Sequence, residues 1–338
     1  MSQLAHGDGA FVGSAQYERS RRFVEPDGPD RGYTRPNFML VGAMRCGTSA
    51  LYRLLDGNPL ISMSSPKEPH HFVAQHYDAF TGPGDEWVAS QVVRTRGHYE
   101  RIMQPREGAR ISGEASATYL YYQDALSSIA ERVPGVKIVV LLREPVARSY
   151  SAYWYLRSQN REWLTSFDAA LEAEDARIRD GFGPMWHYAS ASHYADGLRL
   201  CYRLFGADRV FVSTNERLVR DPRGFLVDLS AFLDVPCVHT ETISIKTNGS
   251  GQPHSTLLNA VLHPPPIIRR VLRAVMPSSS VRLVRRARKS NLRPIPRLDV
   301  VRERALRAQF ANDVDEVSGL TGLDLSEWRP HNDVRGDR

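Results

Sequence analysis

The chain has 338 residues, of which 42% are hydrophobic and 24% are charged, so it can bury a sizeable core and is too apolar for wholesale disorder. Its formal net charge of +6 favours an anionic ligand or an anionic surface. The three cysteines, Cys46, Cys201 and Cys237, lie far apart, which predicts neither a disulfide framework nor a thiolate metal site and fits a reducing cytoplasm.

The two ends of the chain differ from its middle. Residues 1–36 are polar and contain no apolar stretch of the length found in signal peptides. We therefore expect a disordered leader over residues 1–35, one domain over residues 36–330 and a short tail over residues 331–338. The longest apolar runs have the length of strands, so no membrane span is predicted and the expected location is cytoplasmic.

The domain is expected to begin with a strand, a turn and a helix. Residues 37–43 form a short apolar run that ends at glycine and alanine, which is typical of a buried parallel strand. Leu51, Leu54 and Leu55 then fall on one face of a helix. The sequence Asp56-Gly-Asn-Pro59 should end that helix.

Two further strand and helix pairs follow along the chain. Residues 136–142 predict a buried strand that runs into a helix ending near residue 156, and residues 208–213 predict another strand followed by a helix near residues 222–233. Alternating strands and helices form a parallel sheet with helices on both faces. We therefore expect a three-layer α/β domain of P-loop type with about five parallel strands.

The C-terminal part has an unusual charge distribution. Residues 242–298 contain neither Asp nor Glu, and residues 263–290 hold eight Lys or Arg interleaved with apolar residues. This stretch is either a solvated helical cover over an acceptor cleft or a reversible contact with an anionic bilayer. No nucleic-acid-binding motif accompanies the charge. Helical periodicity over residues 302–320 completes a helical part that we expect on the acceptor side.

The turn after the first strand has the chemistry of an anion site. Backbone N–H groups and the positive end of a helix dipole meet there. Gly42 and Gly47 have the spacing of the first two Walker A glycines, but Thr48 stands where the Walker lysine should be. The cation is instead Arg45, which could stabilise charge on the bridging oxygen of a 5′-phosphosulfate without a metal. The alternative is an ordinary corner with an exposed arginine.

Four segments together resemble the family of 3′-phosphoadenosine 5′-phosphosulfate (PAPS)-dependent sulfotransferases. The run Gly42-Ala-Met-Arg-Cys-Gly-Thr-Ser-Ala-Leu51 resembles their 5′-phosphosulfate loop, and Arg143-Glu-Pro-Val-Ala-Arg-Ser-Tyr-Ser151 resembles their 3′-phosphate motif. Lys67-Glu-Pro-His-His-Phe72 and Gly113-Glu-Ala-Ser-Ala-Thr-Tyr119 resemble segments of the heparan-sulfate-type branch. The resemblance extends over about residues 36–330.

This resemblance implies PAPS as co-substrate and a set of residues that bind it. Arg148 should buttress the phosphate loop. Most relatives have Lys in place of Arg45, and Arg keeps the charge but is a poorer proton donor, so an electrostatic role is expected. The expected nucleotide-binding residues are Arg45, Cys46, Gly47, Thr48, Ser49, Arg143 and Ser151, with Asn248 and Gly249 from a more loosely matching loop.

Deprotonation of the acceptor hydroxyl needs a base, since its own pKa is high. The resemblance assigns this role to Glu68, and His70 is the alternative base or the residue that orients the acceptor. His71 is expected to pack beside Phe72. Glu114 could support the site or contact the acceptor.

The predicted reaction is sulfuryl transfer from PAPS to a hydroxyl of a glycan, a glycolipid or a small molecule. The Cys pair and the Lys-Gly-Arg loop of the heparan-type branch are not clear in this chain, so a heparan-like polymer is not implied. Two other functions stay open. One is a P-loop kinase, against which Thr48 counts, and the other is a non-catalytic protein of the same fold that binds anions or membranes.

Overall fold

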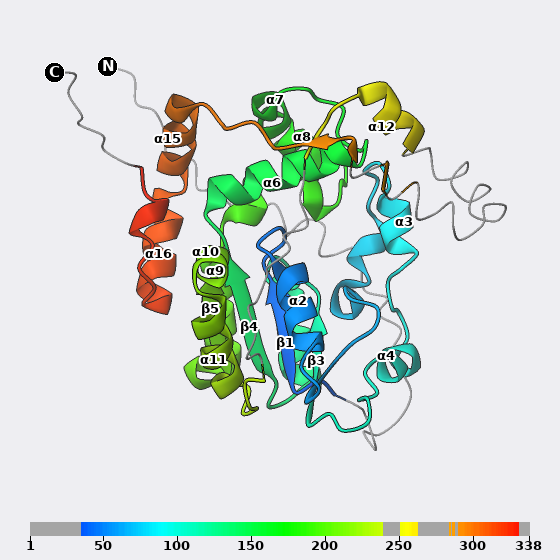
Figure 1. The fold of residues 1–338 in the computed structure, drawn as a ribbon, viewed down its shortest axis with the longest axis vertical. Helices are drawn as coiled ribbons and strands as arrows, with labels where there is room; N and C mark the ends of the chain where they lie inside the picture. Colours follow the sequence, from blue (N-terminus) through cyan, green and yellow to red (C-terminus); the bar gives the residue numbers. More distant parts are fainter. Residues whose placement is uncertain (1–34, 239–250, 263–283, 285, 288–289, 331–338) are drawn as a thin grey trace. The chain divides into compact units, whose positions relative to one another are not determined.

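The computed structural model describes residues 35–238, 251–262, 284, 286–287 and 290–330. At its centre is a five-stranded sheet with the order β2-β3-β1-β4-β5, and every neighbouring pair is parallel (Figure 1). This confirms the predicted α/β fold. The strands are β1 (Phe38–Gly42), β2 (Ile61–Met63), β3 (Ile111–Ala115), β4 (Lys137–Leu142) and β5 (Val210–Thr214), and a separate antiparallel pair joins β6 (Gln252–Pro253) to β7 (Leu292–Arg293).

The α-helices fall into three groups along the chain. Those of the N-terminal half are α2 (Thr48–Asp56), α3 (Asp85–Ala89), α4 (Arg96–Ile102), α5 (Gln123–Arg132) and α6 (Pro145–Ser158). Those that follow are α7 (Phe167–Glu172), α8 (Glu174–Arg179), α9 (Ala195–Phe205), α10 (Asn215–Arg220) and α11 (Pro222–Phe232). The last are α12 (Thr256–Leu262), α15 (Val300–Gln309) and α16 (Ala311–Thr321).

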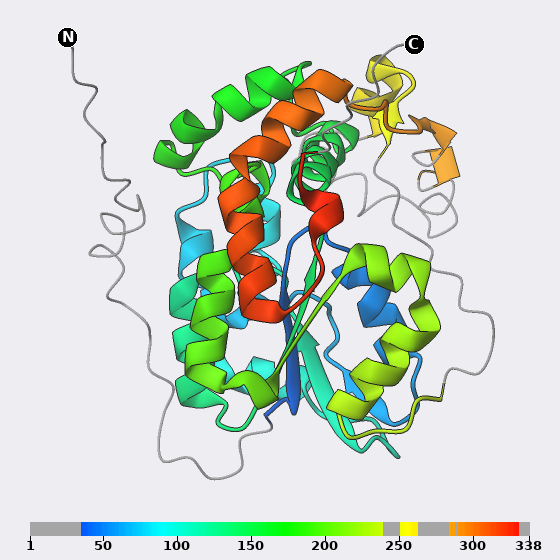
Figure 2. The same cartoon turned by 90° about the vertical axis from the view of Figure 1, so that its left-hand side faces the viewer.

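Side chains alternate between the two faces of the sheet, and each face has its own core. On β1, Phe38 and Leu40 belong to the core that α2 and α11 cover, whereas Met39 and Val41 face the larger core formed with α5, α6 and α9. Figure 2 shows the sheet between these two helical layers. All four side chains are fully buried, as expected for a parallel sheet that helices cover on both sides.

The order of the strands determines where a ligand can bind. β1 lies between β3 and β4, so the segments that leave the carboxyl ends of these three strands meet at one edge of the sheet. In open parallel sheets, ligands bind in the crevice at this edge. The turn from β1 to α2 and the junction from β4 to α6 both lie there (Figure 1).

The C-terminal periodicity is present as two helices rather than one. Phe310 separates α15, which ends at Gln309, from α16, which begins at Ala311. α15 contacts α6, and α16 contacts α9. None of the helices in the described ranges has both the length and the hydropathy needed to cross a bilayer. The leader, the tail, Asn248, Gly249 and most of the basic stretch at 263–290 lie outside the described residues.

Candidate active site

The turn between β1 and α2 has the geometry of an anion-binding loop. Gly47 adopts φ 96°, and a Cβ atom there would lie 2.3 Å from Nδ2 of Asn215, so only glycine fits. Thr48 and Ser49 are the first residues of α2, and their backbone N–H groups therefore have no acceptor within the helix. Together with the dipole of a nine-residue helix, these groups suit the binding of a phosphate or sulfate.

Arg45 brings the two predicted phosphate motifs together. Its guanidinium donates to Oγ of Ser151 at 3.3 Å, and Nη1 of Arg143 donates to the backbone carbonyl of Arg45 at 3.5 Å. These residues come from the β1–α2 turn and from the β4–α6 junction, more than 90 residues apart in sequence. The structure therefore places Arg45, Arg143 and Ser151, three of the nine predicted nucleotide-binding residues, in one cluster at the carboxyl edge of the sheet.

Tyr155 is a member of this cluster that the sequence analysis missed. The guanidinium of Arg45 lies over its ring, 4.3 Å from the ring centroid. Burial lowers the pKa of Arg45 to about 10, and the nearby charges of Arg143 and Arg148 act in the same direction. Because this pKa is still well above neutral pH, the side chain stays a cation. Tyr155 follows Ser151 by four residues on α6, a spacing that puts both on one helix face and could have indicated it.

Arg148 hydrogen-bonds the backbone of the phosphate loop, which confirms its expected role as a support of that loop. Its side chain is completely buried, and its Nε donates to the carbonyl of Met44 at 3.1 Å. Nη1 donates to the carbonyls of His187 and Tyr188 at 3.0 and 3.1 Å. A buried guanidinium held by these carbonyls ties the phosphate loop to the segment before α9.

The two segments predicted to form the acceptor side lie next to each other. The N–H of Glu68 donates to the carbonyl of Ala115 at 2.9 Å, and the N–H of Ala117 donates to Oε2 of Glu68 at 3.0 Å. Ala117 in turn packs against Met44 of the phosphate loop. Glu68 is therefore anchored to the same edge of the sheet as Arg45.

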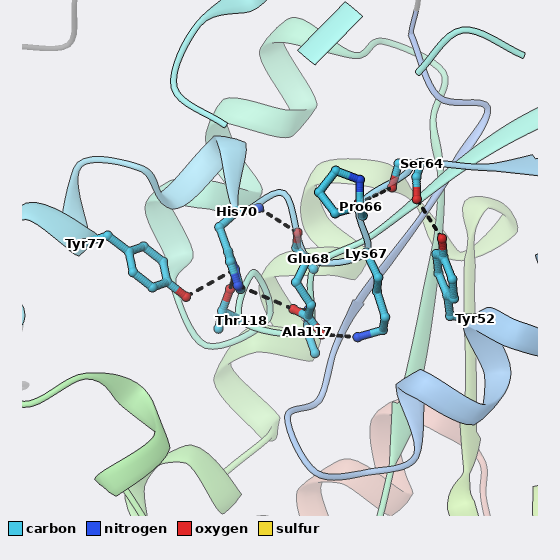
Figure 3. Close-up of polar contacts among 10 residues, drawn as sticks. Tyr52, Ser64, Pro66, Lys67, Glu68, His70, Tyr77, Ala117 and Thr118 are labelled. Carbon is cyan, nitrogen blue, oxygen red and sulfur yellow. Dashed lines mark hydrogen bonds and ion pairs between the residues drawn. The ribbon is translucent and has the colours of Figure 1, made fainter. Parts of the chain in front are cut away.

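Glu68 and His70 form the centre of the polar network in Figure 3. Glu68 makes an ion pair with Lys67, and its Oε2 lies 3.8 Å from Nε2 of His70. Nδ1 of His70 lies 3.2 Å from both the Tyr77 hydroxyl and Oγ1 of Thr118. The side chain of Glu68 keeps 29% of its surface exposed, whereas that of His70 keeps 9%, so the carboxylate is the more accessible of the two groups.

The electrostatics of the pair favour a charged carboxylate and a neutral imidazole. Burial raises the pKa of Glu68, but the charge of Lys67 and the bond from Ala117 outweigh it, so the pKa lies below its ordinary value. Burial lowers the pKa of His70 to about 4. At neutral pH both groups are therefore in the state that can accept a proton.

Buried side chains and a small pocket lie near this pair. As expected, the His71 ring packs against Phe72, with the ring centroids 5.1 Å apart. Glu114 is fully buried, and burial raises its pKa to about 7. A small pocket opens beside the phosphate loop, lined by residues that include Met44, Ala117, Tyr121 and His193.

Asp313 of α16 is a second contributor that the sequence analysis missed. Its carboxylate accepts the backbone N–H groups of Tyr194 and Ala195, at 2.9 and 3.2 Å, at the start of α9. The Tyr194 hydroxyl then donates to the carbonyl of Arg143 at 2.9 Å. The link spans 118 residues or more along the chain, so no local sequence signal could have indicated it.

Cys46 lies inside the loop with its thiol shielded from solvent. Its side chain is fully buried, and burial raises the pKa of its thiol to about 11, so the reactive thiolate is scarce at neutral pH. Cys201 is equally buried, whereas Cys237 is only partly buried. We expect N-ethylmaleimide at about pH 7.5 to label Cys237 in the folded protein and to spare Cys46, as mass spectrometry would show. Rapid labelling of Cys46 would contradict this.

Comparison with known proteins identifies the family. A family model described as "Sulfotransferase family" matches residues 36–240, which is more than half of the chain. The chain belongs to the sulfotransferase family. Its fold is similar to a crystal structure of a sulfotransferase from Alicyclobacillus acidocaldarius, with a TM-score of 0.66, 31% identity, and coverage of 87% of this chain and 98% of that one.

Curated relatives of this sulfotransferase family member are more distant. Heparan sulfate glucosamine 3-O-sulfotransferase 6 of Mus musculus is 28% identical over 61% of this chain and 54% of its own length. The membrane-associated sulfotransferase kil1 of Dictyostelium discoideum is 28% identical over 41% of this chain and 28% of its own length. The chain thus spans about half of the first relative and less than a third of the second.

No three His, Cys, Asp or Glu side chains within the described ranges gather closely enough to hold a metal ion. Metal independence of this family member remains a prediction. So does the role of Asn248 and Gly249, which lie outside the described residues.

Proposed function

We propose that this sulfotransferase family member transfers a sulfuryl group from PAPS to an acceptor hydroxyl. The observation that carries the proposal is the convergence of Arg45, Arg143 and Ser151 on one loop, with Glu68 anchored beside it through Ala117. The cluster offers cations and N–H donors to both phosphate groups of the nucleotide, and Glu68 offers a base to the acceptor.

The reaction is an in-line displacement at sulfur. The acceptor oxygen attacks the sulfur, its proton passes to Glu68, and the bond between sulfur and the bridging oxygen of the 5′-phosphate breaks. Adenosine 3′,5′-bisphosphate (PAP) leaves with the negative charge that develops on that oxygen. Arg45 and the first N–H groups of α2 stabilise this charge, because they are fixed in place before the reaction begins.

The binding of the nucleotide can be tested without knowing the acceptor. We expect PAP to bind more tightly than AMP or ADP, with no need for Mg²⁺. Arg143 and Ser151 should read the 3′-phosphate, and loss of one charge-assisted contact should cost about 1.5–3 kcal/mol. Calorimetry on the wild type and on Arg143→Ala measures this preference, and Arg203→Ala, which removes an exposed charge from α9, is the matched control.

Two results would count against this assignment. Equal affinity for PAP and AMP would mean that the 3′-phosphate is not read. An absolute Mg²⁺ requirement, with ATP preferred over PAP, would favour the kinase alternative. Thr48, at the position of the Walker lysine, is 5% exposed and supplies no cation for a γ-phosphate.

The acceptor is proposed at the level of chemical class. Relatives named as heparan sulfate glucosamine 3-O-sulfotransferases support a glycan hydroxyl, and a hydroxyl of a glycolipid or a small molecule is the alternative. Radiolabelled PAPS incubated with a panel of glucosamine oligosaccharides, glycolipids and simple phenols would identify the preferred class. Contact of the basic stretch at 263–290 with an anionic bilayer stays a prediction.

A further inference from the structure

Glu114 is a buried carboxyl group for which the proposed reaction has no direct use. It lies on β3, and its side chain is completely buried. The hydroxyl of Tyr99, from α4, donates to its Oε2 at 2.8 Å. The hydroxyl groups of Ser116 and Tyr119 lie close enough to lower the pKa of this carboxyl against the effect of burial, although Oε1 makes no hydrogen bond within the described residues. Three hydroxyl-bearing residues thus surround one carboxyl.

Ser116, Tyr99 and Tyr119 also contact three consecutive residues, 70–72, of the loop at residues 68–72. Oγ of Ser116 accepts the N–H of His70 at 3.1 Å. The hydroxyl of Tyr119 accepts the N–H of Phe72 at 3.4 Å. The ring of Tyr99 stacks on the imidazole of His71, with the ring centroids 4.4 Å apart. Every link from Glu114 therefore leads to the loop that carries Glu68 and His70.

This loop needs support from outside itself. Glu68 has φ 61° and His70 has φ 53°, which is left-handed backbone that residues other than glycine adopt at a cost. Contacts elsewhere in the structure must hold such a conformation. The contacts that hold this loop come from other segments, through Ser116, Tyr99 and Tyr119. Because the Glu114 carboxyl orients the hydroxyl groups of these residues, it influences the geometry of the loop.

We propose that Glu114 is a positioning residue for sulfuryl transfer, which holds the loop at residues 68–72 through Tyr99, Ser116 and Tyr119 so that the Glu68 carboxylate faces the acceptor. This inference rests on the proposed function, since it assumes that Glu68 is the base. Glu114 acts through its neighbours and touches neither the nucleotide nor the acceptor.

Hydrogen exchange tests the positioning independently of any acceptor. In Glu114→Ala, amides in residues 67–73 should exchange about tenfold faster than in the wild type, the effect of losing about one hydrogen bond. Amides in residues 45–51 should keep their rates. Unchanged exchange at 67–73, or an equal increase over the whole chain, would overturn the inference.

Transfer assays test the consequence for catalysis, with the panel acceptor of highest turnover and labelled PAPS as probes. Glu114→Ala should lower kcat about tenfold to a hundredfold while the Kd for PAP changes by less than about twofold. Glu114→Gln, which keeps the shape and one acceptor oxygen, should recover most of the rate. A Glu68→Gln/Glu114→Ala double variant should be no slower than Glu68→Gln alone, because both changes act on one group.

A second variant keeps the test valid if Glu114→Ala does not fold. Tyr99→Phe removes only the hydroxyl bonded to Glu114, and Tyr153→Phe is its matched control, because the buried Tyr153 donates its hydroxyl to the carbonyl of Leu164 at 3.1 Å. Only Tyr99→Phe should lower kcat and speed exchange at residues 67–73. Equal effects of the two variants would reduce Glu114 to a structural role. Normal transfer by Glu68→Gln would instead refute the base assignment and leave the exchange result standing.

Discussion

Glu68→Gln should lower the rate of sulfuryl transfer by about 10²–10⁴-fold while leaving the affinity for PAP nearly unchanged. The amide can still accept the N–H of Ala117, which lies 3.0 Å from the carboxylate oxygen, so the loop should keep its shape. It cannot accept a proton from the acceptor. Steady-state kinetics with labelled PAPS, together with PAP calorimetry, measure the two effects separately.

The same assay decides between Glu68 and His70. Glu107→Gln, on an exposed loop, is the matched control and should behave like the wild type. Because the pKa of Glu68 lies below its ordinary value, protonation of this group should not reduce the rate between about pH 8 and pH 6. If Glu68→Gln turned over normally and His70→Ala were inactive, the base would be His70.

Arg45→Ala should lower the transfer rate by about 10²–10³-fold, the usual effect of removing one fixed donor from a site where charge develops. The guanidinium is held by Ser151 at 3.3 Å and by the Tyr155 ring at 4.3 Å, so little reorganisation is needed during the reaction. Arg45→Lys keeps the positive charge and should retain much more of the rate. Single-turnover kinetics separate this effect from weaker binding of PAPS.

The pair Arg45→Ala and Arg45→Lys distinguishes an electrostatic role from a structural one. A rate for Arg45→Ala within about threefold of the wild type would remove Arg45 from the mechanism. Equal losses in both variants would mean that the contacts with Ser151 and Tyr155, rather than the charge, are what the site requires. A matched loss of positive charge at Arg203, exposed on α9, should leave the rate unchanged.

Much of this fold could be predicted from local sequence patterns. The apolar runs at 37–43 and 136–142 predicted β1 and β4, since strands buried on both faces are continuously apolar. The shorter apolar run at 210–212, within the predicted strand 208–213, indicated β5 at the edge of the sheet. β2 has only three residues, and β3 includes Gly113 and Glu114, so neither shows such a run. β3 pairs with β1 and β2 pairs with β3, so the positions of both strands depend on tertiary contacts.

The residue types of the candidate site could be predicted from the sequence, but the contacts that bring them together could not. The glycine spacing of the phosphate loop, Arg45 within it and the Arg143 to Ser151 motif are local features that already predicted an anion site and a sulfotransferase. The strand order brings these two motifs to one edge of the sheet, and chain-distant contacts add Tyr155 and Asp313.

The environment of the carboxyl groups was decided by the tertiary structure alone. The sequence shows Glu68 and Glu114 as single carboxylates in two short motifs and gives no sign of the different environments that they occupy. Lys67 and the N–H of Ala117 stabilise the charge of Glu68, while complete burial raises the pKa of Glu114 to about 7. A pKa depends on desolvation and on neighbouring charges in space, and neither exists until the chain has folded.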